Sequence, residues 1–146
     1  MSKFPKPYRW SPKHPEKYAG DPTQIWVRSG WEQKAMLFFD NNPDILEWSS
    51  EEIVIPYLSP VDNRIHRYFP DFVVVSKSST GINNYLVEVK PKAQTLPPKK
   101  RKKSTPRMIT EIMTYEVNQA KWAAAQHWCK IKNMTFLILT EDHIKP

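Results

Sequence analysis

The sequence has one cysteine, three glycines and no long apolar run. A lone Cys129 cannot form an internal disulfide or a multi-cysteine zinc site, so nothing in the chain requires an oxidising compartment. No apolar stretch approaches the roughly 18 residues that a membrane-spanning helix needs, and the N-terminus carries no charged-then-apolar leader. We therefore expect a soluble, unprocessed protein, located by default in the cytosol, with no membrane partner and no small-molecule cofactor.

Proline is abundant, with 14 residues, several of them among the first 22. Because proline fixes φ and removes a backbone donor, residues 1–22 are predicted to form an extended arm, packed over the domain or lying on a partner. The whole chain is 40% hydrophobic and contains six each of Trp, Tyr and Phe, enough for one core. Residues 23–146 are therefore predicted to form a single domain.

The positive charge is concentrated in one segment. The formal net charge is +7, from 22 basic and 15 acidic residues. Eight of the basic residues and none of the acidic ones lie between Lys90 and Arg107, so the rest of the chain is close to neutral. The basic loop 91–107 is therefore predicted to contact a polyanion. The residues predicted to bind DNA there are Lys92, Lys99, Lys100, Arg101, Lys102, Lys103 and Arg107.

The spacing of apolar residues predicts two helices. In residues 31–42 apolar side chains recur three and four positions apart, with Ser29 available as a cap and Pro43 as a stop. Residues 109–131 repeat this spacing over a longer amphipathic stretch.

Runs of β-branched and aromatic residues predict strands at 53–57, 65–75 and 85–89, and a buried strand at 134–140. Turn-forming clusters separate the first three strands, which are expected to pair as an antiparallel meander. The order α-β-β-β-α-β predicts an α/β fold in which a central mixed sheet is flanked by helices.

Two acidic residues and a lysine lie on these predicted strands. Glu88 and Lys90 occupy alternate positions and so share a face, and Asp71 directly precedes an apolar run. If the two strands pair as a hairpin, Asp71 lies close to Glu88. Carboxylates embedded in apolar strands are costly unless a cation compensates them. We therefore predict that two carboxylates and an ammonium meet at one end of the sheet.

Such a group suits phosphodiester hydrolysis. Mg²⁺ prefers oxygen ligands and is usually held by one or two carboxylates together with waters and a substrate phosphate. Asp71 and Glu88 are the predicted ligands. The metal would stabilise charge on the phosphorane oxygens and acidify a bound water, and Lys90 would orient that water or help to remove its proton.

Pro70-Asp71 and Glu88-Val89-Lys90 resemble the motif of the PD-(D/E)xK nuclease superfamily. Residues 28–32, 67–72 and 119–141 look like the TnsA-type endonucleases and their tailed-phage relatives, the head completion nucleases. This resemblance implies a restriction-endonuclease-like core and adds Glu32, on the first helix, as a further catalytic residue and metal ligand. The chain ends soon after its last predicted strand, which favours the phage branch over the two-domain transposition endonucleases.

The resemblance also implies an activity and a setting. It implies an endodeoxyribonuclease that uses Mg²⁺, with Mn²⁺ as a substitute, and acts on double-stranded DNA during packaging and virion assembly. Phage portal or head proteins are the candidate partners, and the host cytoplasm or the virion is the expected location. Two alternatives stay open: a non-catalytic DNA-binding or structural virion protein, and a transposition-type DNA-cleaving subunit.

Several of these residues also have ordinary structural explanations. Glu32 stands in the first turn of a helix, where with Ser29 it fits a capping box. The run 99–103 could be only a solvated charge cluster. On the long helix, Gln119 and Lys121 are predicted to face solvent and Cys129 to be a core residue.

Overall fold

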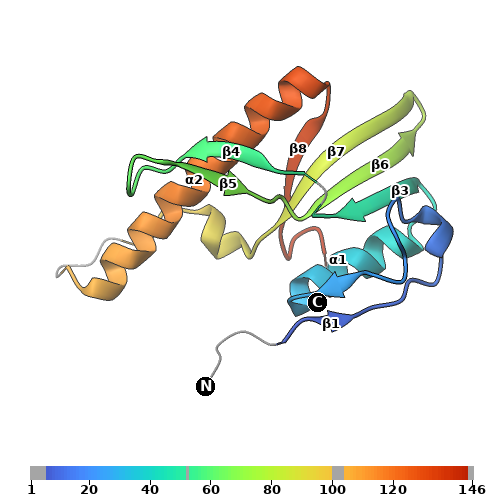
Figure 1. The fold of residues 1–146 in the computed structure, drawn as a ribbon, viewed down its shortest axis with the longest axis horizontal. Helices are drawn as coiled ribbons and strands as arrows, with labels where there is room; N and C mark the ends of the chain where they lie inside the picture. Colours follow the sequence, from blue (N-terminus) through green and yellow to red (C-terminus); the bar gives the residue numbers. More distant parts are fainter. Residues whose placement is uncertain (1–5, 52, 100–103, 145–146) are drawn as a thin grey trace.

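Four strands form the central sheet of the computed structural model, which describes residues 6–51, 53–99 and 104–144. Their order is β3-β6-β7-β8, with bounds Ile45–Ser50, Phe72–Ser78, Gly81–Val89 and Thr135–Leu139. The first three are antiparallel neighbours, whereas β7 and β8 run parallel. Helices α1 (Gly30–Asn41) and α2 (Pro106–Lys132) contribute to the separate cores on the two faces of this sheet (Figure 1). The predicted mixed sheet between helices is confirmed.

Side chains of β7 alternate between the two cores. Val87 and Val89 belong to the core under α1, while Leu86 belongs to the core under α2. In the α1 core the rings of Phe39, Trp48 and Phe72 pack together, with centroids 5.1 to 6.1 Å apart. Phe72 is the first residue of β6, so this packing fixes the position of the residue before it, Asp71.

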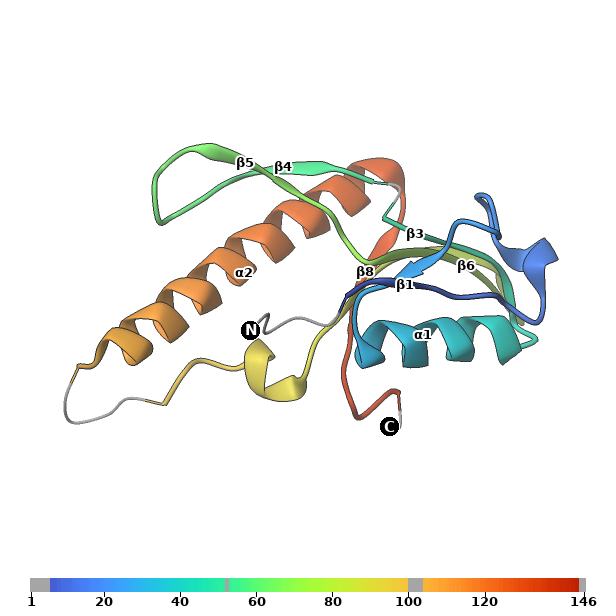
Figure 2. The same ribbon diagram turned by 60° about the horizontal axis from the view of Figure 1, so that its bottom comes forward.

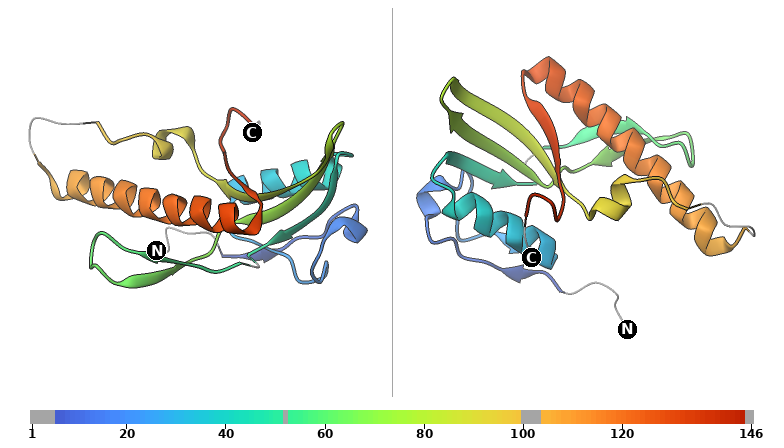
Figure 3. Two further views of the ribbon diagram at one scale, coloured as in Figure 1. Left: turned by 90° about the horizontal axis from the view of Figure 1, so that it is seen from above. Right: turned by 180° about the vertical axis from the view of Figure 1, so that it is seen from behind.

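The predicted meander is wrong in its first part. Strands β4 (Ile55–Leu58) and β5 (Ile65–Tyr68) pair only with each other, as a two-stranded ribbon. The predicted strand 65–75 is divided because Pro70, which is fully buried and has no N–H, cannot continue a ladder. Figures 2 and 3 show this ribbon lying along α2, and the two projecting together away from the central sheet.

The hairpin of β6 and β7 is confirmed and is longer than predicted. Ser78 pairs with Gly81, so only two residues form the turn, and Gly81 adopts a φ of 138° that favours glycine. The strand predicted at 134–140 is confirmed as β8, but its predicted burial is wrong, because β8 lies at the edge of the sheet and Leu137 is 36% exposed. In the three described ranges no helix is both long and apolar enough to cross a bilayer.

The N-terminal segment packs closely against α1 and β3. It contains the short strand β1 (Tyr8–Arg9) and the turn η1 (Pro15–Lys17), and a further strand, β2 (Trp26–Val27), pairs with β1. The rings of Trp10 and Tyr18 pack on Trp48, with centroids 6.1 and 4.8 Å away. The described part of the segment therefore completes the α1 core.

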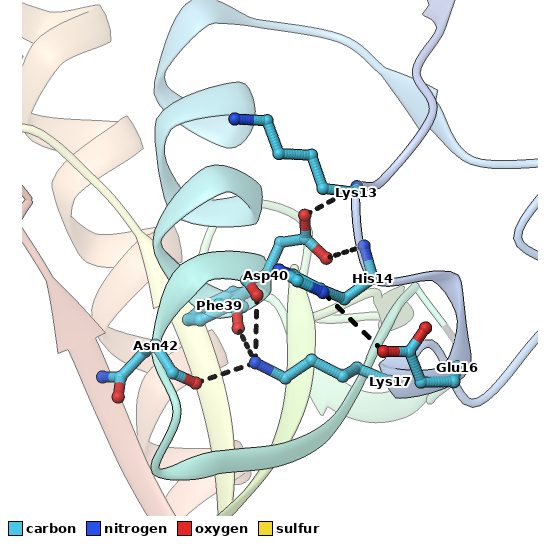
Figure 4. A network of polar contacts seen from close by, with 7 residues as sticks. All are labelled: Lys13, His14, Glu16, Lys17, Phe39, Asp40 and Asn42. Carbon is cyan, nitrogen blue, oxygen red and sulfur yellow. Dashed lines mark hydrogen bonds and ion pairs between the residues drawn. The ribbon is translucent and has the colours of Figure 1, made fainter.

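A polar network fastens this segment to the end of α1 (Figure 4). The buried Asp40 carboxylate accepts hydrogen bonds from the backbone N–H groups of Lys13 (2.8 Å) and His14 (3.1 Å). The Lys17 ammonium donates to the carbonyls of Phe39, Asp40 and Asn42 at 2.7 to 3.0 Å, where the helix presents free carbonyls and the negative end of its dipole.

Replacing Asp40 by alanine is expected to destabilise the protein by on the order of 2–3 kcal/mol, since two part-buried N–H groups lose their acceptor. Chemical denaturation measures the change. Asp44→Ala removes an exposed carboxylate near the same helix end and should stay within about 0.5 kcal/mol of wild type. If Asp40→Ala destabilised the protein no more than Asp44→Ala does, the network would not be what holds the segment in place.

Candidate active site

The register of the β6–β7 hairpin brings the two predicted carboxylates together. Phe72 pairs with Val87, so the next position on each strand places Asp71 across from Glu88. Phe72 and Val87 pack in the core under α1. Because side chains alternate along a strand, Asp71 and Glu88 lie on the opposite face of the sheet, the one that α2 covers. In Figure 1 this end of the hairpin lies at the centre of the molecule, between the two helices.

Asp71 is held by the neighbouring strand. Its Oδ2 accepts a hydrogen bond from the Val89 N–H at 2.7 Å. Burial raises the pKa of the Asp71 carboxyl to about 7, the negative charges of Glu32 and Glu51 add to the rise, and the Val89 hydrogen bond and the Lys90 charge oppose it. Ionised Asp71 therefore lies in a place where a further positive charge would be stabilising.

Glu88 is more deeply buried, with 5% of its surface exposed. The hydroxyl of Tyr68, at the end of β5, donates a hydrogen bond to its Oε2. Burial raises the pKa of the Glu88 carboxyl to about 7, against the attraction of Lys90 and Lys121. Two adjacent carboxyls thus have similarly raised pKa values, an arrangement that is common at functional sites.

Lys90 and Glu32 lie beside this pair. Lys90 follows β7 and is half-buried, its backbone N–H donates to the Leu139 carbonyl at 3.0 Å, and its charge lowers the pKa of both carboxyls. Glu32 stands in the first turn of α1, and its negative charge raises the pKa of Asp71 and Glu88. The structure thus places Lys90 and Glu32 close enough to Asp71 and Glu88 for their charges to shift the pKa values of both carboxyls.

Glu32 is also a capping residue, as the alternative explanation holds. Its N–H donates to Ser29 Oγ at 3.2 Å, and its Oε2 accepts from the Arg28 N–H at 3.1 Å. Burial raises the pKa of Glu32, and the Arg28 hydrogen bond opposes that rise. One carboxylate oxygen of Glu32 therefore accepts a hydrogen bond at the start of the helix. The negative charge of the same side chain raises the pKa of Asp71 and Glu88.

The donor set fits a magnesium ion better than a metal that needs a protein cage. Among the described residues no three His, Cys, Asp or Glu side chains gather closely enough to hold an ion. Mg²⁺ does not require such a cluster, because one or two carboxylates with waters and substrate phosphates usually suffice. Half-buried Asp71 and buried Glu88 meet that requirement without Glu32, the third ligand that the resemblance implied.

Sequence reasoning missed Tyr68 and wrongly predicted that Lys121 faces solvent. Lys121 of α2 is half-buried rather than solvent-facing, and its Nζ lies 5.8 Å from the ring centroid of Tyr57 and 5.7 Å from that of Tyr68. Burial and the nearby Lys90 lower its pKa, while Glu88 and Asp71 raise it. A signal existed: Lys121 stands four residues from both Val117 and Ala125, on the apolar stripe of α2.

The predicted DNA-binding residues are only partly described. Lys100, Arg101, Lys102 and Lys103 lie outside the described residues, and Lys99 is exposed. Lys92 forms an ion pair with Asp142 (3.0 Å), and Arg107 forms one with Glu111 (3.2 Å). All four side chains are substantially exposed. Exposed pairs of this kind contribute little stability, so a phosphate could replace either carboxylate.

Glu32→Gln is expected to lower DNA cleavage by about tenfold, less than a change at Asp71, because removing a neighbouring charge costs less than removing a direct ligand. The amide can still accept the Arg28 hydrogen bond, so the melting temperature should change little. Cleavage rates across a magnesium series measure the effect, with partial recovery at high magnesium. An unchanged magnesium dependence would leave Glu32 with helix capping alone.

Comparisons with known proteins agree with the motif. Residues 42–141 match the family described as TnsA-like endonuclease N terminal. The chain is also 40% identical over 141 residues to the head completion nuclease of Enterobacteria phage T4, a match that covers 94% of this chain and 92% of that protein. The family match contains Asp71, Glu88 and Lys90 and begins after Glu32.

Proposed function

Because this chain belongs to the TnsA-like endonuclease family and is a homologue of a phage head completion nuclease, we propose that it hydrolyses double-stranded DNA with the help of a divalent cation. The observation that carries the proposal is the cross-strand placement of Asp71, which is half-buried, and Glu88, which is buried, each with its pKa raised to about 7. A bound cation would compensate both carboxylates when they are ionised.

Each site residue has a proposed role. Asp71 and Glu88 hold the ion, Mg²⁺ or in its place Mn²⁺, and Glu32 adds negative potential and an acceptor for a metal-bound water. When bound, the ion supplies Lewis acidity and a more acidic water. The Lys90 side chain, whose charge lowers the pKa of both carboxyls, orients the attacking water as an ammonium or, as the neutral amine, takes up a proton from that water.

The proposed wider setting extends the similarity to the T4 relative. We assign residues 23–146 to one nuclease domain with a restriction-endonuclease-like core, and place its action at DNA packaging and head completion. Phage portal or head proteins are the proposed partners, and the host cytoplasm or the virion the proposed location. The name of the T4 relative supports this setting.

Incubation of plasmid DNA with the purified protein tests the function. Cleavage is expected with Mg²⁺ or Mn²⁺ and should stop when EDTA is added. Cleavage that continues in EDTA would contradict the proposed cation. A folded protein that binds DNA but leaves it intact under varied salt and pH would instead favour the non-catalytic virion protein.

Neutralising Lys99, Lys100, Arg101, Lys102 and Lys103 is expected to weaken binding to all DNA sequences alike. Phosphate contacts carry no sequence information, and each lost contact should reduce the slope of log affinity against log salt by about 0.9 on duplex DNA. Binding by Asp71→Ala protein, with and without the five changes, measures this apart from cutting. Superimposable slopes would mean that the segment serves another partner.

A further inference from the structure

Two side chains from outside the motif bring hydrogen-bond donors toward the Glu88 carboxylate. The Tyr68 hydroxyl, from β5, donates to Glu88 Oε2. The indole of Trp122, from the middle of α2, is the side chain whose N–H favours the charged form of Glu88. Neither residue belongs to the Asp71, Glu88 and Lys90 motif.

Trp122 has an unused donor. The residue is 5% exposed, and its Nε1–H finds no hydrogen-bond partner of proper geometry among the described residues. The indole thus lies close enough to Glu88 to favour the ionised carboxylate, yet the hydrogen bond itself is not formed. A buried unpaired donor is costly and calls for an explanation.

The ring of Tyr68 is itself held in place. It lies in the core under α2, with 4% of its surface exposed, and the Lys121 ammonium is 5.7 Å from its centroid. Because Tyr68 precedes Phe69-Pro70-Asp71, the same turn that carries one carboxylate also carries the donor to the other. The two predicted ligands are therefore connected through Tyr68, at the end of β5.

We propose that Tyr68 and Trp122 are positioning residues that orient the Glu88 carboxylate for a divalent cation, and that the Trp122 indole completes its hydrogen bond to Glu88 when the cation binds. This inference rests on the proposed function, since it takes Glu88 as a ligand. A carboxylate that gives one oxygen to a metal needs its other oxygen fixed, and loss of such an outer partner typically weakens metal binding by about 10–100-fold.

Calorimetry of Mg²⁺ binding to the DNA-free protein tests the positioning role. Tyr68→Phe and Trp122→Phe each remove one donor and keep the ring, and each should weaken binding by about tenfold. The chain offers matched controls. Tyr57→Phe removes the hydroxyl of a second tyrosine whose ring lies beside Lys121. Trp48→Phe removes a second buried indole N–H, which lies in the α1 core and also has no partner in the described part of the chain. Both controls should bind Mg²⁺ as wild type does.

The indole signals in an NMR spectrum of ¹⁵N-labelled wild-type protein provide a second readout that does not depend on any variant folding. Addition of Mg²⁺ should shift the Trp122 Nε1–H signal downfield and slow its exchange with water, as a newly formed hydrogen bond requires. The Trp48 signal should stay in place. In Tyr68→Phe protein the same shift should need about ten times more Mg²⁺.

The outcomes separate this inference from the function on which it rests. If wild-type protein binds no Mg²⁺ and Asp71→Ala changes nothing, the metal site itself is wrong. If wild-type protein binds Mg²⁺ but Tyr68→Phe has wild-type affinity and the Trp122 signal does not move, the site stands and the positioning role is overturned.

Discussion

Asp71→Ala should reduce DNA cleavage to background, and Lys90→Ala should reduce it by about 10²–10⁴-fold, the usual contribution of a proton-transferring side chain. Asp71 is the proposed ligand across the hairpin from Glu88, and Lys90 supplies the neighbouring ammonium. Neither change removes a core packing contact, so both proteins should fold. Single-turnover cleavage of saturating DNA isolates the loss from changes in binding.

Two exposed residues give matched controls for these variants. Asp44→Ala removes a carboxylate just before β3, and Lys77→Ala removes an ammonium from the far end of β6. Both should cut DNA at the wild-type rate. Folded Asp71→Ala or Lys90→Ala protein with full activity would remove these residues from the chemistry.

The metal-free protein should be more stable at about pH 5 than at about pH 8, by roughly 2–3 kcal/mol for each of Asp71 and Glu88, since one pKa unit corresponds to about 1.4 kcal/mol. Burial raises both pKa values to about 7, so between about pH 4 and pH 7 the folded state binds more protons than the unfolded chain. Stability is therefore lost as the pH rises through this window.

Denaturation across pH, without metal, measures this dependence. The double variant Asp71→Asn with Glu88→Gln should flatten it, since neither amide ionises. Added Mg²⁺ should restore stability most at about pH 8, where the carboxylates are ionised and free to bind it. If the stability of the wild-type protein changed between pH 5 and pH 8 in the same way as that of the double variant, the pKa values of the two carboxyls would not be raised by burial.

The helices and the β6–β7 hairpin follow from local patterns. Both helices have a steady apolar spacing and clear ends: Ser29 caps α1, Thr105 caps α2, and Asn133 ends α2 in a left-handed conformation. The alternation in β7 placed Glu88 and Lys90 on one face, and a hairpin was enough to bring Asp71 opposite. Cys129 was expected in a core and is buried in the one under α2.

The missed features depend on contacts between distant segments. β3 escaped detection because a register irregularity between Ile45 and Glu47 breaks its alternation and leaves two adjacent side chains exposed. The ribbon of β4 and β5 looks like part of the sheet in sequence, but Pro70 interrupts the strand and the ribbon packs against α2. Tyr68 becomes part of the candidate site by the same packing, which no local pattern encodes, whereas Lys121 has a signal in its place on the apolar stripe of α2.

Iron-directed cleavage of the protein backbone tests most directly the central claim that a divalent cation binds between Asp71 and Glu88. Fe²⁺ occupies oxygen-ligand sites, and with ascorbate and peroxide the bound ion produces radicals that cut the adjacent chain. Fragment masses should place the cuts near the start of β6 and the end of β7, and Mg²⁺ or Asp71→Ala should suppress them. Cuts confined to other segments, in a protein that still needs Mg²⁺ to cleave DNA, would contradict this site.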